Sequence, residues 1–167
     1  VIKIILHLFV MNKLYYSYSD IHNMVKQGSL RLRDFKPDYI VAVAGGGLIP
    51  ARMLRTFINV PIISITLSFY NDKNQIMDVP KILQWIDKET IQGKNVLIVD
   101  EVDDTRKTLS YLIEFFKQNS KKLGVFVVNN KIKDKVYKIP KDVLYISCKE
   151  NTDIWINYPW DNTNFIE

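Results

Sequence analysis

One segment limits what this chain can fold into more than any other: an apolar strand that runs into a row of acids and then into a helix. Residues 96–99 are Val-Leu-Ile-Val, and the adjacent carboxylates Asp100 and Glu101 follow them. Asp103 and Asp104 extend the acidic row, before a turn that opens a stretch with helical apolar spacing. A short apolar run bounded in this way is typical of a strand buried in a parallel sheet. The segment therefore predicts one strand–turn–helix unit of an α/β fold.

The turn after the acids has the chemistry of a phosphate-binding loop. Residues 105–108 read Thr-Arg-Lys-Thr. Backbone N–H groups at a helix start bind anions, and threonine hydroxyls add donors. Carboxylates just before such a loop can hold ribose hydroxyls, or Mg²⁺ through water. The acids alone do not separate this function from the acidic strand end of a receiver-like or generic nucleotide-binding fold, but the whole pattern is much more specific.

The rest of the chain continues the alternation of strands and helices. We expect one helix capped at Ser19 and Asp20, which runs to about residue 35 with an interruption near Gly28, and two more at 48–57 and 108–116. Expected strands are 39–44, 62–67, 82–86, 95–100, 123–129 and 143–147, and the polar stretch 68–80 is expected to be a mobile loop. This alternation predicts a mostly parallel sheet, in which ligands bind beyond the carboxyl ends of the strands. That rule selects residues 45–47, 68–70, 100–108 and 130–131.

Composition narrows the class of protein further. A length of 167 residues, without repeats or a Gly/Ser linker, predicts a single domain over 1–167. The net charge of +5 suits phosphate-rich molecules, and we interpret the lysine cluster 131–135 as solvated surface rather than a nucleic-acid footprint. The lone Cys148 excludes an internal disulfide and a cysteine-based zinc site, and is interpreted as a small buried residue. The apolar start, 1–10, is too short to span a membrane and is either an extra strand or an extension before a start at Met11.

The acidic segment resembles the PRPP-binding signature of the type I phosphoribosyltransferases. The resemblance extends from about Met11 onward, and the Asp-Glu-Val-Asp-Asp-Thr-Arg form is similar to the yeast-type hypoxanthine-guanine branch. Most members have glycine where this chain has Arg106, so that side chain must point away from the phosphate. The resemblance implies a Rossmann-like phosphoribosyltransferase fold, with a mostly parallel sheet flanked by helices, a flexible flap loop and a small C-terminal hood, here 151–167. The hood is similar to those of the xanthine-guanine and yeast-type enzymes.

The resemblance also implies roles for individual residues. Asp104 is the implied catalytic base. The implied PRPP-binding residues are Asp100, Glu101, Asp103, Thr105, Arg106, Lys107, Thr108, Ala44, Gly45 and Gly46. Asp100 and Glu101 would also hold Mg²⁺, mostly through water, and the peptide between Ala44 and Gly45 is often cis in this family. Ser68 and Tyr70 would belong to the flap, and Lys131, Trp155 and Ile156 would contact the base.

The implied activity is transfer of ribose 5-phosphate from PRPP to a 6-oxopurine (guanine, hypoxanthine or xanthine), which gives the nucleoside monophosphate and pyrophosphate in purine salvage. Asn157 stands where the family often has glutamate, so the choice among the three bases stays open. The alternatives are an adenine or other phosphoribosyltransferase, favoured less by Lys131, and a non-catalytic PRPP-sensing regulator that binds nucleic acid. The family implies a cytoplasmic homodimer or homotetramer with no nucleic-acid or membrane partner.

Overall fold

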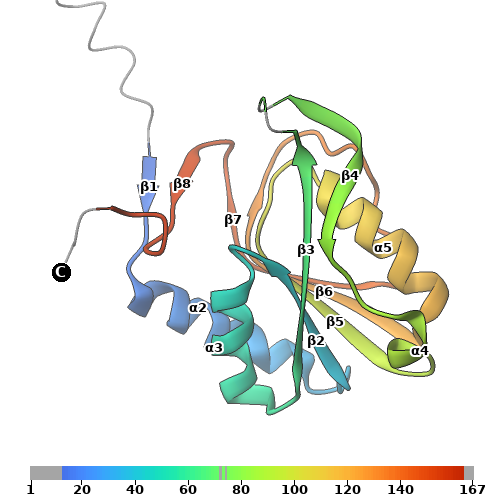
Figure 1. Ribbon diagram of the computed structural model, residues 1–167. Helices are drawn as coiled ribbons and strands as arrows, with labels where there is room; N and C mark the ends of the chain where they lie inside the picture. The colour runs from blue at the N-terminus through green and yellow to red at the C-terminus, as the bar shows by residue number, and fades with distance from the viewer. Residues whose placement is uncertain (1–12, 72, 74, 164–167) are drawn as a thin grey trace, which may run out of the picture.

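A six-stranded sheet is the framework of the structure (Figure 1). The computed structural model describes residues 13–71, 73 and 75–163, so the apolar start at 1–10 and the last four residues of the expected hood lie outside the described residues. The strands are β2 (Tyr39–Ala44), β3 (Ile62–Tyr70), β4 (Ile76–Gln84), β5 (Asn95–Asp103), β6 (Lys122–Lys131) and β7 (Leu144–Asn151). Their order is β4-β3-β2-β5-β6-β7, and all neighbours are parallel except β3 and β4. The predicted α/β class with a mostly parallel sheet is confirmed.

Helices cover both faces of this sheet (Figure 1). Helices α2 (Tyr18–Ser29) and α3 (Leu48–Ile58) lie on one face, and η2 (Leu30–Leu32), a 3₁₀ turn, follows α2. Helix α5 (Lys107–Asn119) and the short α4 (Lys88–Ile91) lie on the other face. Strand β5 is apolar on both sides because Leu97 packs toward α2 and α3 while Ile98 packs toward α5. Within the described part of the chain, no helix has the length and apolarity that crossing a membrane requires.

The first helix differs from the sequence prediction at its N-terminus. Its N-cap is Ser17 rather than Ser19. The Ser17 Oγ accepts a hydrogen bond from the Asp20 N–H at 3.1 Å, and the Asp20 carboxylate accepts one from the Ser17 N–H at 2.8 Å, a reciprocal capping pair. The α-helix ends at Ser29, one residue after Gly28, and the chain continues as the 3₁₀ turn η2, so the interruption predicted near Gly28 is confirmed. A Cβ there would lie 2.8 Å from the Phe126 ring and 2.7 Å from the Cys148 Sγ, so the glycine lets α2 pack closely on the sheet.

The stretch 68–80 is not the loop that its polarity predicted. Strand β3 continues to Tyr70, and β4 begins at Ile76 and pairs with β3 in the antiparallel sense, so the expected flap is a β-hairpin. Strand β3 extends because Phe69 still packs into the core with 9% exposure. Most of β4 is exposed, which leaves no alternation of buried and exposed residues for the sequence to reveal.

A second small sheet forms the hood. Strand β1 (Lys13–Tyr15) pairs in parallel with β8 (Trp155–Asn157), so the hood contains residues from both ends of the described chain (Figure 1). The sequence predicted only its C-terminal part. Ile156 and Tyr158 are buried against the α2 side of the core, and this packing attaches the hood to the main sheet.

Candidate active site

The residues selected at the strand ends lie at one edge of the sheet. Strand β2 ends at Ala44, β5 at Asp103 and β6 at Lys131, and these three strands are neighbours. The parallel register pairs Asp103 with Asn130, so the ends of β5 and β6 are level. The hood and the tip of the β3–β4 hairpin lie at the same end of the sheet (Figure 1). Because ligands bind beyond the carboxyl ends of parallel strands, this edge is the candidate active site.

Two adjacent carboxyl groups, Asp100 and Glu101, lie at this edge near the end of β5. Asp100 is 8% exposed. Its burial, and then the neighbouring Glu101 carboxylate, raise the pKa of Asp100 well above its usual value. A divalent cation, which takes oxygen ligands, relieves the repulsion that the Glu101 carboxylate exerts on Asp100. The pair therefore fits the implied Mg²⁺ site.

The glycine turn between β2 and α3 lies directly beside this acidic pair. The peptide between Ala44 and Gly45 is cis, the form that the family resemblance implied. A Cβ at Gly46 would overlap the Glu101 carboxylate, so only glycine lets the backbone approach the acid this closely. The turn thus presents backbone groups, rather than side chains, next to the acids.

Arg106 belongs to the framework of the phosphate loop. It has a left-handed backbone conformation, with φ of 70°, at the N-cap of α5. Its guanidinium donates hydrogen bonds to Asp103 Oδ2 at 2.7 and 2.9 Å and lies over the Tyr145 ring at 5.3 Å. The Tyr145 hydroxyl donates to the same carboxylate oxygen at 2.7 Å, and burial followed by this bond raises the pKa of Tyr145 well above its usual value.

These contacts answer how a side chain fits where most family members have glycine. The Asp103 side chain is fully buried and the Arg106 side chain is 13% exposed. In this conformation Asp103 has no exposed carboxylate oxygen for a ligand, so the predicted direct contact of Asp103 with PRPP is not supported. Both residues instead hold the turn that places the backbone of 105–108 at the start of α5. The side chain of Arg106, the N-cap residue, makes no hydrogen bond to the first backbone N–H groups of α5.

Lys107 joins the phosphate loop to the flap hairpin. Its ammonium donates a hydrogen bond to the Met77 carbonyl oxygen at 2.7 Å and lies 4.9 Å from the centre of the Phe69 ring. Met77 is on β4 and Phe69 on β3, so this one side chain contacts both strands of the hairpin. The sequence predicted Lys107 as a PRPP ligand, and the structure shows its ammonium on the flap.

The lysine cluster 131–135, which begins at the last residue of β6, is not the solvated surface that the sequence suggested. The side chains of Lys131, Lys133 and Lys135 are 11%, 28% and 12% exposed. Ile132 and Val136, at the alternate positions, are 62% and 68% exposed. The three lysines turn inward because each meets acidic or carbonyl oxygens. Lys135 donates to the Asp103 and Asp104 carbonyls at 2.7 and 2.6 Å.

Asp104 lies at the centre of an ion-pair cluster. Lys131 contacts its Oδ2 at 3.2 Å and Lys133 its Oδ1 at 2.9 Å. The same two lysines contact Asp153 of the hood, at 3.6 and 2.9 Å. Burial alone would raise the pKa of Asp104, but the hydrogen bonds from Lys133 and Lys131 outweigh it and lower that pKa. Lys133, Lys135 and Asp153 were missed as site residues. The alternate spacing of Lys131, Lys133 and Lys135 could have indicated that these three side chains point to the same side.

The hood exposes Trp155 and contacts the acidic segment through Tyr158. Trp155 is 57% exposed, whereas Ile156 is buried. The Tyr158 hydroxyl lies 3.0 Å from the Glu101 carbonyl oxygen and 2.9 Å from Asn129 Oδ1, within donating reach of both. Trp160 stacks on Tyr158 with ring centres 4.8 Å apart, so of the two tryptophans Trp160 packs and Trp155 is free to stack on a ligand.

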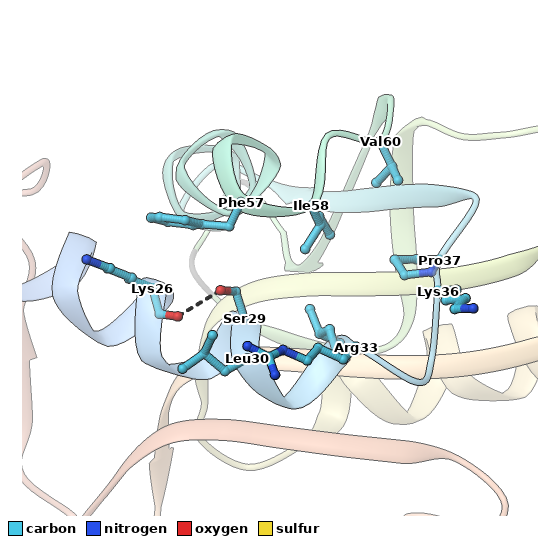
Figure 2. A pocket seen from close by; sticks show the side chains of 10 residues that line it. Lys26, Ser29, Leu30, Arg33, Lys36, Pro37, Phe57, Ile58 and Val60 are labelled. Carbon is cyan, nitrogen blue, oxygen red and sulfur yellow. Dashed lines mark hydrogen bonds between the residues drawn. The ribbon is translucent and has the colours of Figure 1, made fainter.

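A cavity of about 580 Å³ lies elsewhere, between α2, η2 and the end of α3 (Figure 2). Pro37 and Val60, which precede β2 and β3, belong to its lining. The cavity is therefore at the amino ends of the strands, the edge opposite the acids, and it contains none of the predicted site residues.

This arrangement is that of a phosphoribosyltransferase fold. Residues 17–163 match the family model described as the phosphoribosyl transferase domain, and the chain belongs to that family.

Individual relatives agree along nearly the whole length. The chain is 42% identical to the hypoxanthine-guanine phosphoribosyltransferase of Schizosaccharomyces pombe, over 89% of each protein. A hypothetical protein from Neisseria gonorrhoeae, crystallised with bound ppGpp, is 40% identical, with a TM-score of 0.84 over 93% of this chain and 92% of that one. The purine phosphoribosyltransferase of Pyrococcus horikoshii is 32% identical, with a TM-score of 0.73 over 94% and 99% of the two chains. These likenesses identify the chain as an enzyme of the glycosyltransferase type.

Proposed function

We propose that this chain transfers the 5-phosphoribosyl group of PRPP to a 6-oxopurine and releases pyrophosphate. The supporting observation is that three binding elements meet at one edge of the sheet. These are the acidic pair Asp100 and Glu101 near the end of β5, the start of α5, and Lys131 near the hood that carries Trp155. Relatives whose names specify hypoxanthine-guanine and purine substrates support the same substrate class.

PRPP lies along these elements in sequence. The backbone N–H groups and threonine hydroxyls of 105–108 bind the 5-phosphate at the start of α5. Asp100 and Glu101 accept hydrogen bonds from the ribose hydroxyls. The backbone of Ala44, Gly45 and Gly46 binds the pyrophosphate beside Glu101. Arg106 and Asp103 act on the loop rather than on the ligand.

Asp100 and Glu101 would also hold Mg²⁺, mostly through water, and a bound ion would neutralise charge on the departing pyrophosphate. The protein supplies the two carboxylates. A nearby cation would favour the charged form of Asp100, which burial and Glu101 otherwise disfavour.

The purine lies between Trp155 and the end of β6. Trp155 stacks on the ring, the backbone around Ile156 meets one edge, and the Lys131 ammonium donates to the 6-oxo group. A ring nitrogen of the purine forms a bond to the anomeric carbon as the bond from that carbon to the pyrophosphate oxygen breaks. The proton of the purine passes to Asp104. When Lys131 turns from Asp104 to the 6-oxo group, Asp104 loses one of its two ammonium partners, and its affinity for that proton rises.

The β3–β4 hairpin, with Ser68 and Tyr70, closes over PRPP and excludes water that would hydrolyse it. Tyr70 is 57% exposed, which leaves its side chain available for such a contact. Lys107 contacts Phe69 and Met77, which lie next to the turn of the hairpin, so the phosphate loop meets the flap near its tip.

The test is a spectrophotometric assay of the purified chain with PRPP and Mg²⁺ against guanine, hypoxanthine, xanthine and adenine in turn. Nucleotide formation with one or more 6-oxopurines is expected, and it also decides the preference that Asn157 leaves open. Turnover with adenine alone would refute the role of Lys131. PRPP binding without turnover of any base would favour a regulatory protein instead.

A matched pair of variants tests the role of Asp104. Asp104→Asn removes the proton acceptor and is expected to lower kcat roughly 10²–10⁴-fold. Asp134→Asn makes the same change at an exposed acid in the neighbouring loop and is expected to leave turnover unchanged. An Asp104→Asn enzyme with near wild-type turnover would exclude Asp104 as the base.

We further propose that the chain forms a homodimer or homotetramer in the cytoplasm. Light scattering tests the oligomeric state, and cell fractionation tests the location.

A further inference from the structure

Lys133 makes the shortest contacts in the ion-pair cluster around Asp104. Its Nζ lies 2.9 Å from Asp104 Oδ1 and 2.9 Å from Asp153 Oδ2. Lys131 reaches the same two acids at the longer distances of 3.2 and 3.6 Å. One ammonium thus joins the turn before α5 to the hood.

The two acids come from two separate segments that border the proposed purine subsite. Asp104 follows the end of β5, and Asp153 lies two residues before Trp155. The backbone already brings the hood and the lysine segment together, since the Ile132 N–H donates to the Asn151 carbonyl oxygen at 2.7 Å. A side chain that bridges the two acids therefore fixes the spacing between the proposed proton acceptor and the proposed stacking surface.

Lys131 and Lys133 have different roles in the proposed function. In the proposed function Lys131 donates to the 6-oxo group, so its contact with Asp104 is exchanged when the purine binds. Lys133 bonds to the other oxygen of Asp104 and keeps the carboxylate in place during that exchange.

We propose that Lys133 is a positioning residue for the purine subsite, which holds Asp104 and the Asp153 segment of the hood at a fixed distance from each other. The inference rests on the proposed function, and Lys133 acts through the two acids without touching the substrate. The three side chains Lys133, Asp104 and Asp153 are 28%, 44% and 50% exposed, so solvent screens the ion pairs and their share of folding stability is small. Their role is geometric.

The test compares Lys133→Met with Lys138→Met, which removes an exposed lysine of the same segment. For Lys133→Met we expect the KM for the purine to rise roughly tenfold, the magnitude of one lost positioning contact, while the KM for PRPP stays within about twofold. The melting temperature should change by no more than about 3 °C. Lys133→Arg should restore most of the purine affinity because it keeps the bridging charge. Lys138→Met should match the wild type in every respect.

A pH profile separates positioning from a general structural effect. The charged groups that face Asp104 are Lys131 and Lys133 from the β6 side and Asp153 from the hood, and Lys135 bonds to its carbonyl. Loss of one ammonium makes Asp104 easier to protonate, so the acid limb of kcat/KM for the purine should move to higher pH in Lys133→Met. A damaged fold would lower activity at every pH and leave the limb in place.

The outcomes are distinguishable. If the wild-type chain turns over no 6-oxopurine, the proposed function fails. If it does, an unchanged purine KM with an unmoved acid limb in Lys133→Met refutes the positioning role alone. A rise confined to the KM for PRPP would refute it too, because Lys133 would then serve the pyrophosphate side. Asp153→Asn should give the same purine effect, and the double variant should be no worse than either single one.

Discussion

Replacement of Arg106 tests how the phosphate loop is held. Arg106 has a left-handed backbone, a conformation that disfavours a side chain by about 1–2 kcal/mol relative to glycine. Its guanidinium is also the closest cation to the fully buried Asp103 carboxylate, at 2.7 Å. Arg106→Gly therefore relieves the backbone and removes the ion pair at once, whereas Arg106→Ala only removes the pair.

The two contributions have opposite signs. Removal of one partner of a buried ion pair costs about 3–5 kcal/mol, and the lower figure applies because Tyr145 and Lys135 still contact Asp103. Arg106→Ala should thus lose about 3 kcal/mol of unfolding free energy. Relief of the left-handed backbone, reduced by the greater freedom of unfolded glycine, returns about 1 kcal/mol, so Arg106→Gly should lose about 2 kcal/mol. At about 2–4 °C per kcal/mol, the melting temperatures should fall by about 6–12 °C and 4–8 °C.

Urea unfolding followed by circular dichroism and tryptophan fluorescence measures both variants, if the two signals coincide. Arg52→Ala, at an exposed arginine whose guanidinium bonds to Thr56 on α3, is the control and should stay within about 0.5 kcal/mol of wild type. A glycine variant as stable as the wild type would show that the Asp103 pair contributes only about 1 kcal/mol, the amount that relief of the backbone returns. Equal stability of the alanine and glycine variants would refute the backbone argument.

Three further predictions concern the glycines and the thiol. Gly46→Ala should leave the fold intact but raise the KM for PRPP at least roughly tenfold, because the new methyl group displaces Glu101; titration of PRPP at fixed Mg²⁺ measures it, and an unchanged KM contradicts the close contact. Gly28→Ala should lose about 1–3 kcal/mol in urea unfolding through overpacking, and a second change, Cys148→Ala, should restore only part because the Phe126 ring remains. Burial raises the pKa of the Cys148 thiol to about 12, so at pH 8 roughly a thousandfold less thiolate is present than for an ordinary thiol. A thiol reagent should label it only in urea, and rapid labelling of the folded chain would contradict that pKa.

The buried strands could be predicted because their signal is local. Strand β2 has the expected bounds, and the expected core of β5 lies within the observed strand, since both are continuous apolar runs between turn residues. The order of the predicted site segments followed from the same signal, because parallel strands place their carboxyl ends at one edge.

The family resemblance implied a flap and a hood, but their strands could not be predicted because the signal for these strands is not local. Strand β4 is mostly exposed and becomes a strand only through pairing with β3. Strands β1 and β8 are three residues each, and they come from opposite ends of the chain. No periodicity can appear in so few residues, and only the packing of Ile156 and Tyr158 against the core fixes where the pair lies.

The lysine cluster shows how burial reverses the meaning of charge. Three lysines within five residues normally indicate a solvent-exposed segment. Here the lysines occupy alternate positions and point inward, while the apolar residues Ile132 and Val136 are exposed. A buried cationic side chain such as Lys131, 11% exposed, requires paired anionic oxygens, and Asp104 and Asp153 provide them. A 6-oxopurine offers one neutral carbonyl oxygen in exchange for part of that pairing. The exchange keeps Lys131 satisfied only if the second contact to Asp153 persists, which gives the hood an electrostatic as well as a stacking role in binding the purine.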